Sequence, residues 1–165
     1  MTNNDVLRRL RYTFDFDDSK MISIFELADS IVTREQVSNW LKKDEDPAFH
    51  ECMDIELATF LNGLINEMRG KKEGDQPVPE KRMTNNMIFK KLKIALNLKN
   101  DDVLEIMEFA DFELSPHELS AFFRKKGHKN YRECKDQILR NFLQGMQVKY
   151  RDNPYAKVEW KNKFF

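Results

Sequence analysis

The feature that most constrains the fold of this chain is an internal duplication. Residues 1–4, Met-Thr-Asn-Asn, return unchanged as residues 83–86. With a constant offset of 82 and no gap, residues 1–65 align with residues 83–147, and 18 of the 65 pairs are identical. One structural unit is therefore built twice. Units of about 70 residues lie near the lower limit of independent stability. We therefore expect each unit to be stabilised by contacts with the other unit or with a second chain.

The composition is that of a globular protein. Hydrophobic residues make up 41% of the chain and include 13 Phe and 8 Met, while 34% of the residues are charged. These proportions predict a packed core and a soluble surface. The chain starts without the basic and apolar segments of a signal peptide, and no stretch approaches membrane-spanning length. We expect a cytoplasmic protein that does not bind membranes.

The net charge of zero hides an uneven distribution. Residues 1–70 hold 8 Lys and Arg against 14 Asp and Glu, whereas residues 71–165 hold 20 against 14. The simpler explanation is attraction between the two units or between subunits. The alternative is a binding site for a polyanion in the basic half.

The spacing of apolar residues predicts an all-α fold of four to five helices per unit, with the two units related by a pseudo-twofold axis. In the first predicted helix, polar residues 2–4 supply the N-cap. The apolar residues that come next at helical spacing are Val6, Leu7, Leu10 and Phe14. The exposed side of this helix is basic in both copies, and its cations are Arg8, Arg9 and Arg11, repeated as Lys90, Lys91 and Lys93.

Capping signals place the later helices. A second helix is predicted over residues 18–29. Thr33 with Gln36, and Ser115 with Glu118 in the second copy, are capping boxes that start a third helix. A long fourth helix is predicted over residues 54–69, and over residues 136–150 in the second copy.

Each predicted fourth helix carries a glycine in its interior. These residues are Gly63 and Gly145. Because glycine costs a helix about 1 kcal/mol relative to alanine, we expect a close approach of another helix at both positions.

The same signals divide the chain into four segments. Residues 1–69 form the first helical repeat, and residues 83–148 form the second. Residues 70–82 are polar, with glycines and prolines, and are predicted to be a linker. Residues 149–165 form an aromatic and basic tail that docks either on its own protein or on a neighbour.

No combination of residues predicts catalysis. Cys52 and Cys134 occupy matching positions without a second sulfur ligand nearby, so each is expected to be a buried reduced thiol. His50, His117 and His128 have no counterparts in the other copy. The acids that recur in both copies are explained by helix caps and ion pairs. We therefore expect no enzyme, no metal site and no cofactor.

The predicted second and third helices are similar to a helix-turn-helix. The segment from Glu26 to Ala28, followed by residues 33–42, resembles the pattern of phage-repressor-type regulators, although the spacing from Ala28 to Trp40 is one residue short. Val32 and Leu114 stand where that pattern has glycine, which weakens the prediction of a sharp turn.

On this interpretation the third helices face nucleic acid and the basic first helices touch phosphates. The acids Glu35 and Asp44–Asp46 would repel phosphate, so contact should fall mainly on the second copy. The alternative is a solvated helix face. The candidate nucleic-acid contacts are Arg8, Arg9, Arg11, Arg34, Ser38, Asn39, Lys42, Lys90, Lys91, Lys93, His117, Arg124, Lys125 and Lys126.

Six segments of the sequence also carry a likeness to known proteins. They are residues 1–10 (MTNNDVLRRL), 33–43, 57–64, 91–96 (KLKIAL), 119–124 and 131–136 (YRECKD). On these segments the chain resembles the YehS family, small bacterial proteins built from two copies of a domain of unknown function. The resemblance covers about residues 1–148. It implies a bacterial cytoplasmic protein with a duplicated helical fold, and it implies no reaction or substrate.

Two functions are predicted from these features. The first is a nucleic-acid-associated, regulatory protein that acts through its helix-turn-helix-like segments. The second is a protein-interaction adaptor or oligomerising scaffold without nucleic-acid binding, suggested by the oppositely charged halves and the aromatic tail.

Overall fold

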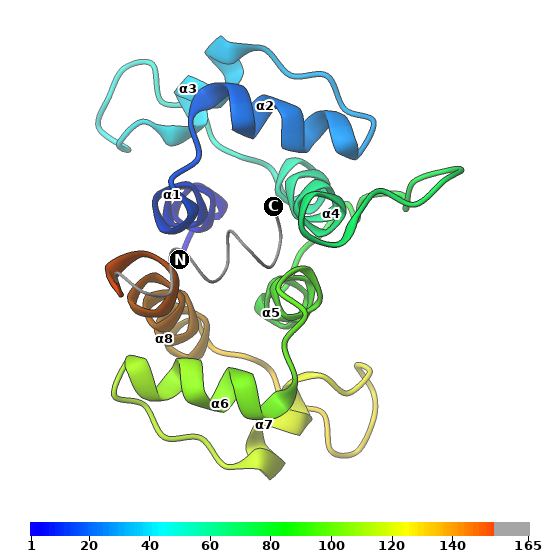
Figure 1. Cartoon of the computed structure of the whole chain (residues 1–165), viewed down its shortest axis with the longest axis vertical. Helices are drawn as coiled ribbons and strands as arrows, with labels where there is room; N and C mark the ends of the chain where they lie inside the picture. The colour runs from blue at the N-terminus through cyan, green and yellow to red at the C-terminus, as the bar shows by residue number, and fades with distance from the viewer. Residues whose placement is uncertain (154–165) are drawn as a thin grey trace. The chain divides into compact units, whose positions relative to one another are not determined.

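The computed structural model describes residues 1–153, and all regular structure within them is helical (Figure 1). The chain divides after Met83 into two compact units. The first unit contains α1 (Asn3–Phe14), α2 (Asp18–Leu27), α3 (Arg34–Leu41) and α4 (Asp54–Arg69). The second contains α5 (Asn85–Ala95), α6 (Asn100–Phe109), α7 (Pro116–Phe122) and α8 (Asp136–Gln147), followed by a π-helical turn, η1 (Val148–Asp152). The all-α, duplicated fold is confirmed.

The predicted capping boxes start the third helix of each unit. The Thr33 hydroxyl accepts a hydrogen bond from the backbone N–H of Gln36, whose side chain accepts one from the N–H of Thr33. Ser115 and Glu118 form the same pair at α7. Two otherwise unsatisfied N–H groups are bonded at each helix start, which fixes where the chain turns into the helix.

The helix ends also repeat. The four non-glycine residues with positive φ in the described part of the chain are Asp15 and Asn97, at 56° and 53°, and Asp29 and Asp111, at 58° and 55°. Each pair is 82 residues apart, and Asp and Asn are the residues that best tolerate this left-handed conformation. The prediction of a second helix reaching residue 29 is wrong by two residues, because the left-handed Asp29 ends α2 at Leu27.

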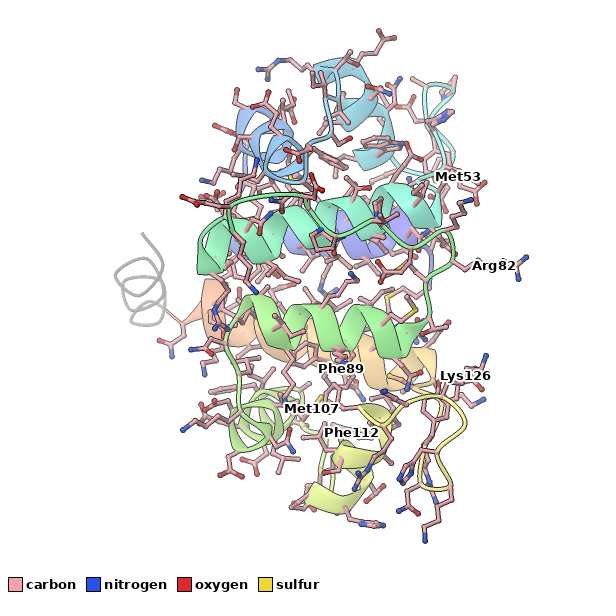
Figure 2. The ribbon with its side chains drawn as sticks, turned by 90° about the vertical axis from the view of Figure 1, so that its right-hand side faces the viewer. Met53, Arg82, Phe89, Met107, Phe112 and Lys126 are labelled. Carbon is pink, nitrogen blue, oxygen red and sulfur yellow. The ribbon has the colours of Figure 1, made fainter. Side chains whose placement is uncertain are left out.

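Each unit has its own core. In the first, α2 packs on α4 and α3, and the Phe25 ring lies between Trp40 and Phe60, with centroids 5.5 and 5.3 Å away. In the second, Phe89 of α5 lies against Phe142, with centroids 4.5 Å apart, and Met107 of α6 is fully buried (Figure 2). Aromatic pairs at these distances add to the stability gained by burying their surface.

Both interior glycines lie where another helix comes close, as predicted. A Cβ atom on Gly63 would overlap the backbone carbonyl oxygen of Ile24 in α2. A Cβ atom on Gly145 would overlap the carbonyl oxygen of Ile106 in α6 in the same way. The absence of a side chain therefore sets the distance between the long helix and its neighbour in both units.

The linker lacks regular structure and is tied to the first unit. Asn66 of α4 donates a side-chain hydrogen bond of 2.7 Å to Gln76, and Lys71 pairs with Asp29 at 3.0 Å. The correspondence between the two units continues beyond the aligned residues 1–65 and 83–147. Met68 and Tyr150 lie 82 residues apart and are equally buried, at 5% exposure. Of the predicted tail, residues 154–165 lie outside the described residues.

Candidate nucleic-acid interface

A buried asparagine near the start of each unit holds the loop that precedes the long helix. In the first unit the Asn4 side-chain amide donates to the carbonyl oxygens of Trp40 and His50, both at 2.9 Å. Its oxygen accepts a hydrogen bond of 2.9 Å from the N–H of Cys52. Asn4 therefore ties both ends of the α3–α4 connection to α1.

Asn86 does the same in the second unit. Its amide donates to the carbonyl oxygens of Phe122 at 3.1 Å and Arg132 at 2.8 Å, and its oxygen accepts from the N–H of Cys134 at 2.9 Å. Every one of these partners is 82 residues beyond its counterpart in the first unit. The two loops thus have the same anchoring, set by residues that are nearly 50 positions away in the sequence.

Backbone hydrogen bonds inside the loops match as well. The N–H of His50 donates to Asn39 at 3.1 Å, and the N–H of Arg132 donates to Ala121 at 3.1 Å. Turns between residues 43 and 46, and between residues 125 and 128, are both closed by bonds of 3.0 Å. We call residues 42–53 the acidic loop and residues 124–135 the basic loop.

The two loops carry opposite charge on this common backbone. The exposed acids of the acidic loop are Asp44, Glu45, Asp46 and Glu51. The exposed cations of the basic loop are Arg124, Lys125, Lys126, Lys129, Arg132 and Lys135. The backbone conformation is therefore independent of the charge, and each unit presents a different electrostatic surface from the same loop.

Most cations of the basic loop have no side-chain partner among residues 1–153. Lys135 pairs with Glu133 at 3.1 Å. The side chains of five cations make no ion pair and no hydrogen bond with a described residue; they are Arg124, Lys125, Lys126, Lys129 and Arg132. Figure 2 shows Lys126 on the outside of this loop. Cations that are not neutralised by their own protein are available to an anionic ligand.

The predicted contacts of the first unit are instead engaged within that unit. Arg8 donates to the carbonyl oxygen of Lys42 at 2.5 Å and to Asp5 at 2.7 Å, and it lies 3.5 Å from Asp44. Its guanidinium thereby helps to hold the acidic loop against α1. A phosphate at Arg8 would have to compete with two carboxylates.

The candidates on α3 make contacts of the same kind. Arg34 donates to the Ser19 hydroxyl at 2.9 Å, and Lys42 donates to the Ser38 hydroxyl at 3.1 Å. Asn39 is half-buried. The Arg34 bond joins α3 to α2 and the Lys42 bond is local to the end of α3, while Arg34, Glu35 and Gln36 stay exposed.

The remaining candidates lie on α1, α5 and α7. Arg9, Arg11 and Lys91 are half-buried, and Lys93 lies over the Phe123 ring at 4.9 Å. Lys90 and His117 are exposed. The contacts predicted from the sequence cover only part of the basic loop. They omit Lys129, Arg132 and Lys135, although the run of cations from residue 124 to residue 135 is the signal that marks them.

The helix pairs differ from a tight helix-turn-helix. Residues 28–33 separate α2 from α3, and residues 110–115 separate α6 from α7. Each connection has six residues, whereas the DNA-binding motif uses a turn of about three to four. The left-handed residues are Asp29 and Asp111, which directly follow the predicted small residue of the motif.

Asp54, one of the recurring acids, makes hydrogen bonds within the fold, and both cysteines are buried. Asp54 accepts hydrogen bonds from the Asn3 side chain at 2.7 Å and from the N–H of Met83 at 2.9 Å. Burial raises the pKa of the Cys52 and Cys134 thiols to about 12, and both are free. Across residues 1–153, no three His, Cys, Asp or Glu side chains are grouped so that they could hold a metal ion.

The pattern of the two units agrees with a family comparison. A family described as "Protein of unknown function (DUF1456)" matches residues 3–70 and residues 85–152. The chain belongs to the DUF1456 family. Each match spans one unit from its first helix to the end of its long helix or the turn after it, so this DUF1456 chain holds two tandem copies of the domain.

A bacterial relative matches the DUF1456 chain over most of its length. The chain is 43% identical over 150 residues to "Uncharacterized protein YehS" of Escherichia coli (strain K12), a match that covers 90% of this chain and 96% of that protein. The resemblance to the YehS family is thus confirmed. No solved structure matches the DUF1456 chain. No helix in its described part is long and apolar enough to cross a membrane.

Proposed function

We propose that this protein is a cytoplasmic, non-enzymatic binding protein that binds nucleic acid through the basic loop of its second unit. The observation that carries the proposal is the set of exposed cations without side-chain partners on a loop that Asn86 holds in place. Because hydrogen bonds from Asn86 hold the loop before binding, little backbone conformational entropy is lost when a ligand binds.

Phosphate groups are the part of a nucleic acid that this loop suits. Lys and Arg side chains bind phosphate oxygens, and each neutralised phosphate releases counterions. Lys90 on α5 and His117 on α7 are exposed and are placed in the same unit. We include these two side chains as further proposed contacts outside the loop.

Recognition of bases by α7 is not part of this proposal. The helix has seven residues, its first turn contains Glu118, and a six-residue connection precedes it. A carboxylate and a loose connection both disfavour insertion into a groove. We therefore expect binding with little dependence on sequence.

A titration with fluorescent duplex and single-stranded oligonucleotides tests the proposal. Fluorescence polarisation at low salt should show binding that weakens as salt is raised. Removing three loop cations, in the variant Arg124→Ala, Lys125→Ala, Lys126→Ala, should weaken binding about tenfold or more. The slope of log affinity against log salt should fall by about 0.9 for each lost phosphate contact with a duplex.

Three exposed cations of the linker region provide the matched control. The variant Lys72→Ala, Lys81→Ala, Arg82→Ala removes the same charge from residues 72–82 and should bind nearly as well as the wild type. Equal losses in the two variants would show that total charge, and not the loop, drives binding. The absence of salt-sensitive binding to any oligonucleotide would end the proposal.

A protein-interaction role is the second candidate function. Its support is the opposite charge of two loops with the same backbone, because such a pair suits association between proteins as well as binding of a polyanion. An oligonucleotide titration without binding, with the loops intact and the protein folded, would favour this role.

A further inference from the structure

The acidic loop borders a hollow in the surface of the first unit. The hollow has a volume of about 400 Å³, and its lining includes Asn3, Asp44, Phe49 and Glu51. Two carboxylates and an aromatic ring therefore face one space. This combination suits a cationic side chain, whose charge pairs with the acids while its aliphatic stem covers the ring.

The basic loop supplies side chains of that kind. Its arginines and lysines are exposed, and the loop has the same anchoring and the same internal turns as the acidic loop. The same chain thus carries both an acidic surface with a hollow and a preorganised loop of cations. The charged side chains of both loops are exposed.

We propose that the acidic loop of one copy of this protein binds the basic loop of a second copy. Arg124, Lys125 or Lys126 of the second copy enters the hollow beside Asp44 and Glu51 of the first. The partner is assigned from the charge complementarity of the two loops. The proposal does not depend on nucleic-acid binding, although a nucleic acid on the basic loop would compete with it.

The proposed contact has a simple symmetry consequence. If two copies are related by a twofold axis, the acidic loop of each copy meets the basic loop of the other, and the two contacts form together. Exposed ion pairs are individually weak and are screened by salt. Two sets of contacts per dimer make an association that is measurable at low salt and lost at high salt.

Five variants and two salt concentrations test the contact. Sedimentation velocity should show self-association of the wild type at about 20 mM salt and a monomer at about 300 mM salt, where the Debye length has fallen several-fold to about 6 Å. Asp44→Lys with Glu51→Lys, which reverses both carboxylates of the hollow, should weaken self-association at least tenfold. Lys125→Glu with Lys126→Glu should do the same.

A charge-swapped chain is the decisive test of the proposed contact. It combines all four substitutions, keeps the net charge of the wild type and should regain self-association, because the two pairs of substituted side chains again carry opposite charges at the proposed contact. An equimolar mixture of the two double variants should form a 1:1 complex. Circular dichroism of each variant checks that its helices are retained. The four side chains are exposed and form no helix cap.

Linker variants control for total charge. Glu73→Lys with Asp75→Lys, and Lys72→Glu with Lys81→Glu, change the net charge by the same amounts and should associate as the wild type does. A wild type that stays monomeric at low salt overturns the proposal. So does a charge-swapped chain that folds but does not associate, or an equal loss in the linker variants. Because these measurements use no nucleic acid, they do not decide the nucleic-acid proposal.

Discussion

The side-chain oxygen of Asn4 accepts a hydrogen bond of 2.9 Å from the backbone N–H of Cys52, a residue 48 positions further along the chain. The two amide hydrogens of Asn4 are used as well, so this one side chain satisfies three backbone groups. It is almost fully buried, at 1% exposure. No water is needed to complete these bonds, and the loop and α1 are held in one arrangement.

Replacing Asn4 by alanine should therefore destabilise the first unit strongly. The change leaves two carbonyl groups and one N–H without their partner, and a buried unsatisfied group costs about 1–3 kcal/mol. We expect a loss of about 3 kcal/mol or more in the free energy of unfolding, measured by urea titration. Asn86→Ala should have a similar effect on the second unit.

Asn130→Ala is the matched control for these two changes. Asn130 is exposed, and its backbone N–H, which alanine retains, is the group that donates to His128. Loss of the Asn130 side-chain amide should change the free energy of unfolding by less than about 0.5 kcal/mol. A small effect of Asn4→Ala would show that the loop is not held by this side chain.

The interior glycines give a second prediction. In an ordinary helix, changing glycine to alanine adds about 1 kcal/mol of stability. Here the added methyl group would overlap the carbonyl oxygen of Ile24 or of Ile106, and overpacking costs about 1–3 kcal/mol. We expect Gly63→Ala and Gly145→Ala to lower the midpoint of thermal unfolding, whereas Lys90→Ala on the exposed side of α5 should leave it nearly unchanged. A rise in the midpoint for either glycine variant would contradict the close approach.

Much of the fold could be predicted because its signals are local. The capping boxes at Thr33 and Ser115 involve residues three positions apart, and the interior glycines stand out within a single helix. The predicted end of α2 lies two residues too far along the chain because Asp29 is compatible with a helix by propensity. Its left-handed conformation depends on how the next segment leaves the helix.

The candidate site was harder to predict because side-chain partners come from distant parts of the chain. Arg8 is one of a basic triplet in the sequence, yet in the fold it bonds the carbonyl of Lys42, 34 positions away. Lys129 and Arg132 join the basic loop because Asn86 anchors it, 46 positions before Arg132. Charge alone could not show which cations are engaged and which are free.

The start of α1 should give a pH-dependent contribution to stability. Burial opposes ionisation of Asp5, but hydrogen bonds from the Thr2 N–H and from Arg8 outweigh it and hold the pKa of this carboxyl below its ordinary value of 3.8. The folded state therefore favours the carboxylate. The contribution is present above about pH 4 and is lost as the pH falls through the lowered pKa.

Asp5→Asn tests this dependence. The side chain is 43% exposed, so solvent screening limits the effect to below about 1 kcal/mol. The difference in unfolding free energy between wild type and variant should be largest near neutral pH and should shrink below about pH 4. Asn97→Asp, at an exposed helix end, provides a control with a new carboxyl outside a capping box. A difference that grows on acidification would contradict the assignment.

The two thiols should be protected from chemical modification in the folded protein. Burial, more than the nearby carboxylates, raises the pKa of Cys52 to about 12, and burial likewise raises that of Cys134 to about 12, whereas the ordinary value is 9.0. The thiolate is the reactive form, so Ellman's reagent at about pH 8 should react slowly with the native protein and rapidly with both thiols in denaturant. Since the folded state favours the protonated thiols, their contribution to stability is complete below the ordinary pKa and declines above about pH 9. Cys52→Ala and Cys134→Ala assign the two reactions, and rapid labelling of either thiol in the native protein would show that its loop opens more readily than the asparagine anchors allow.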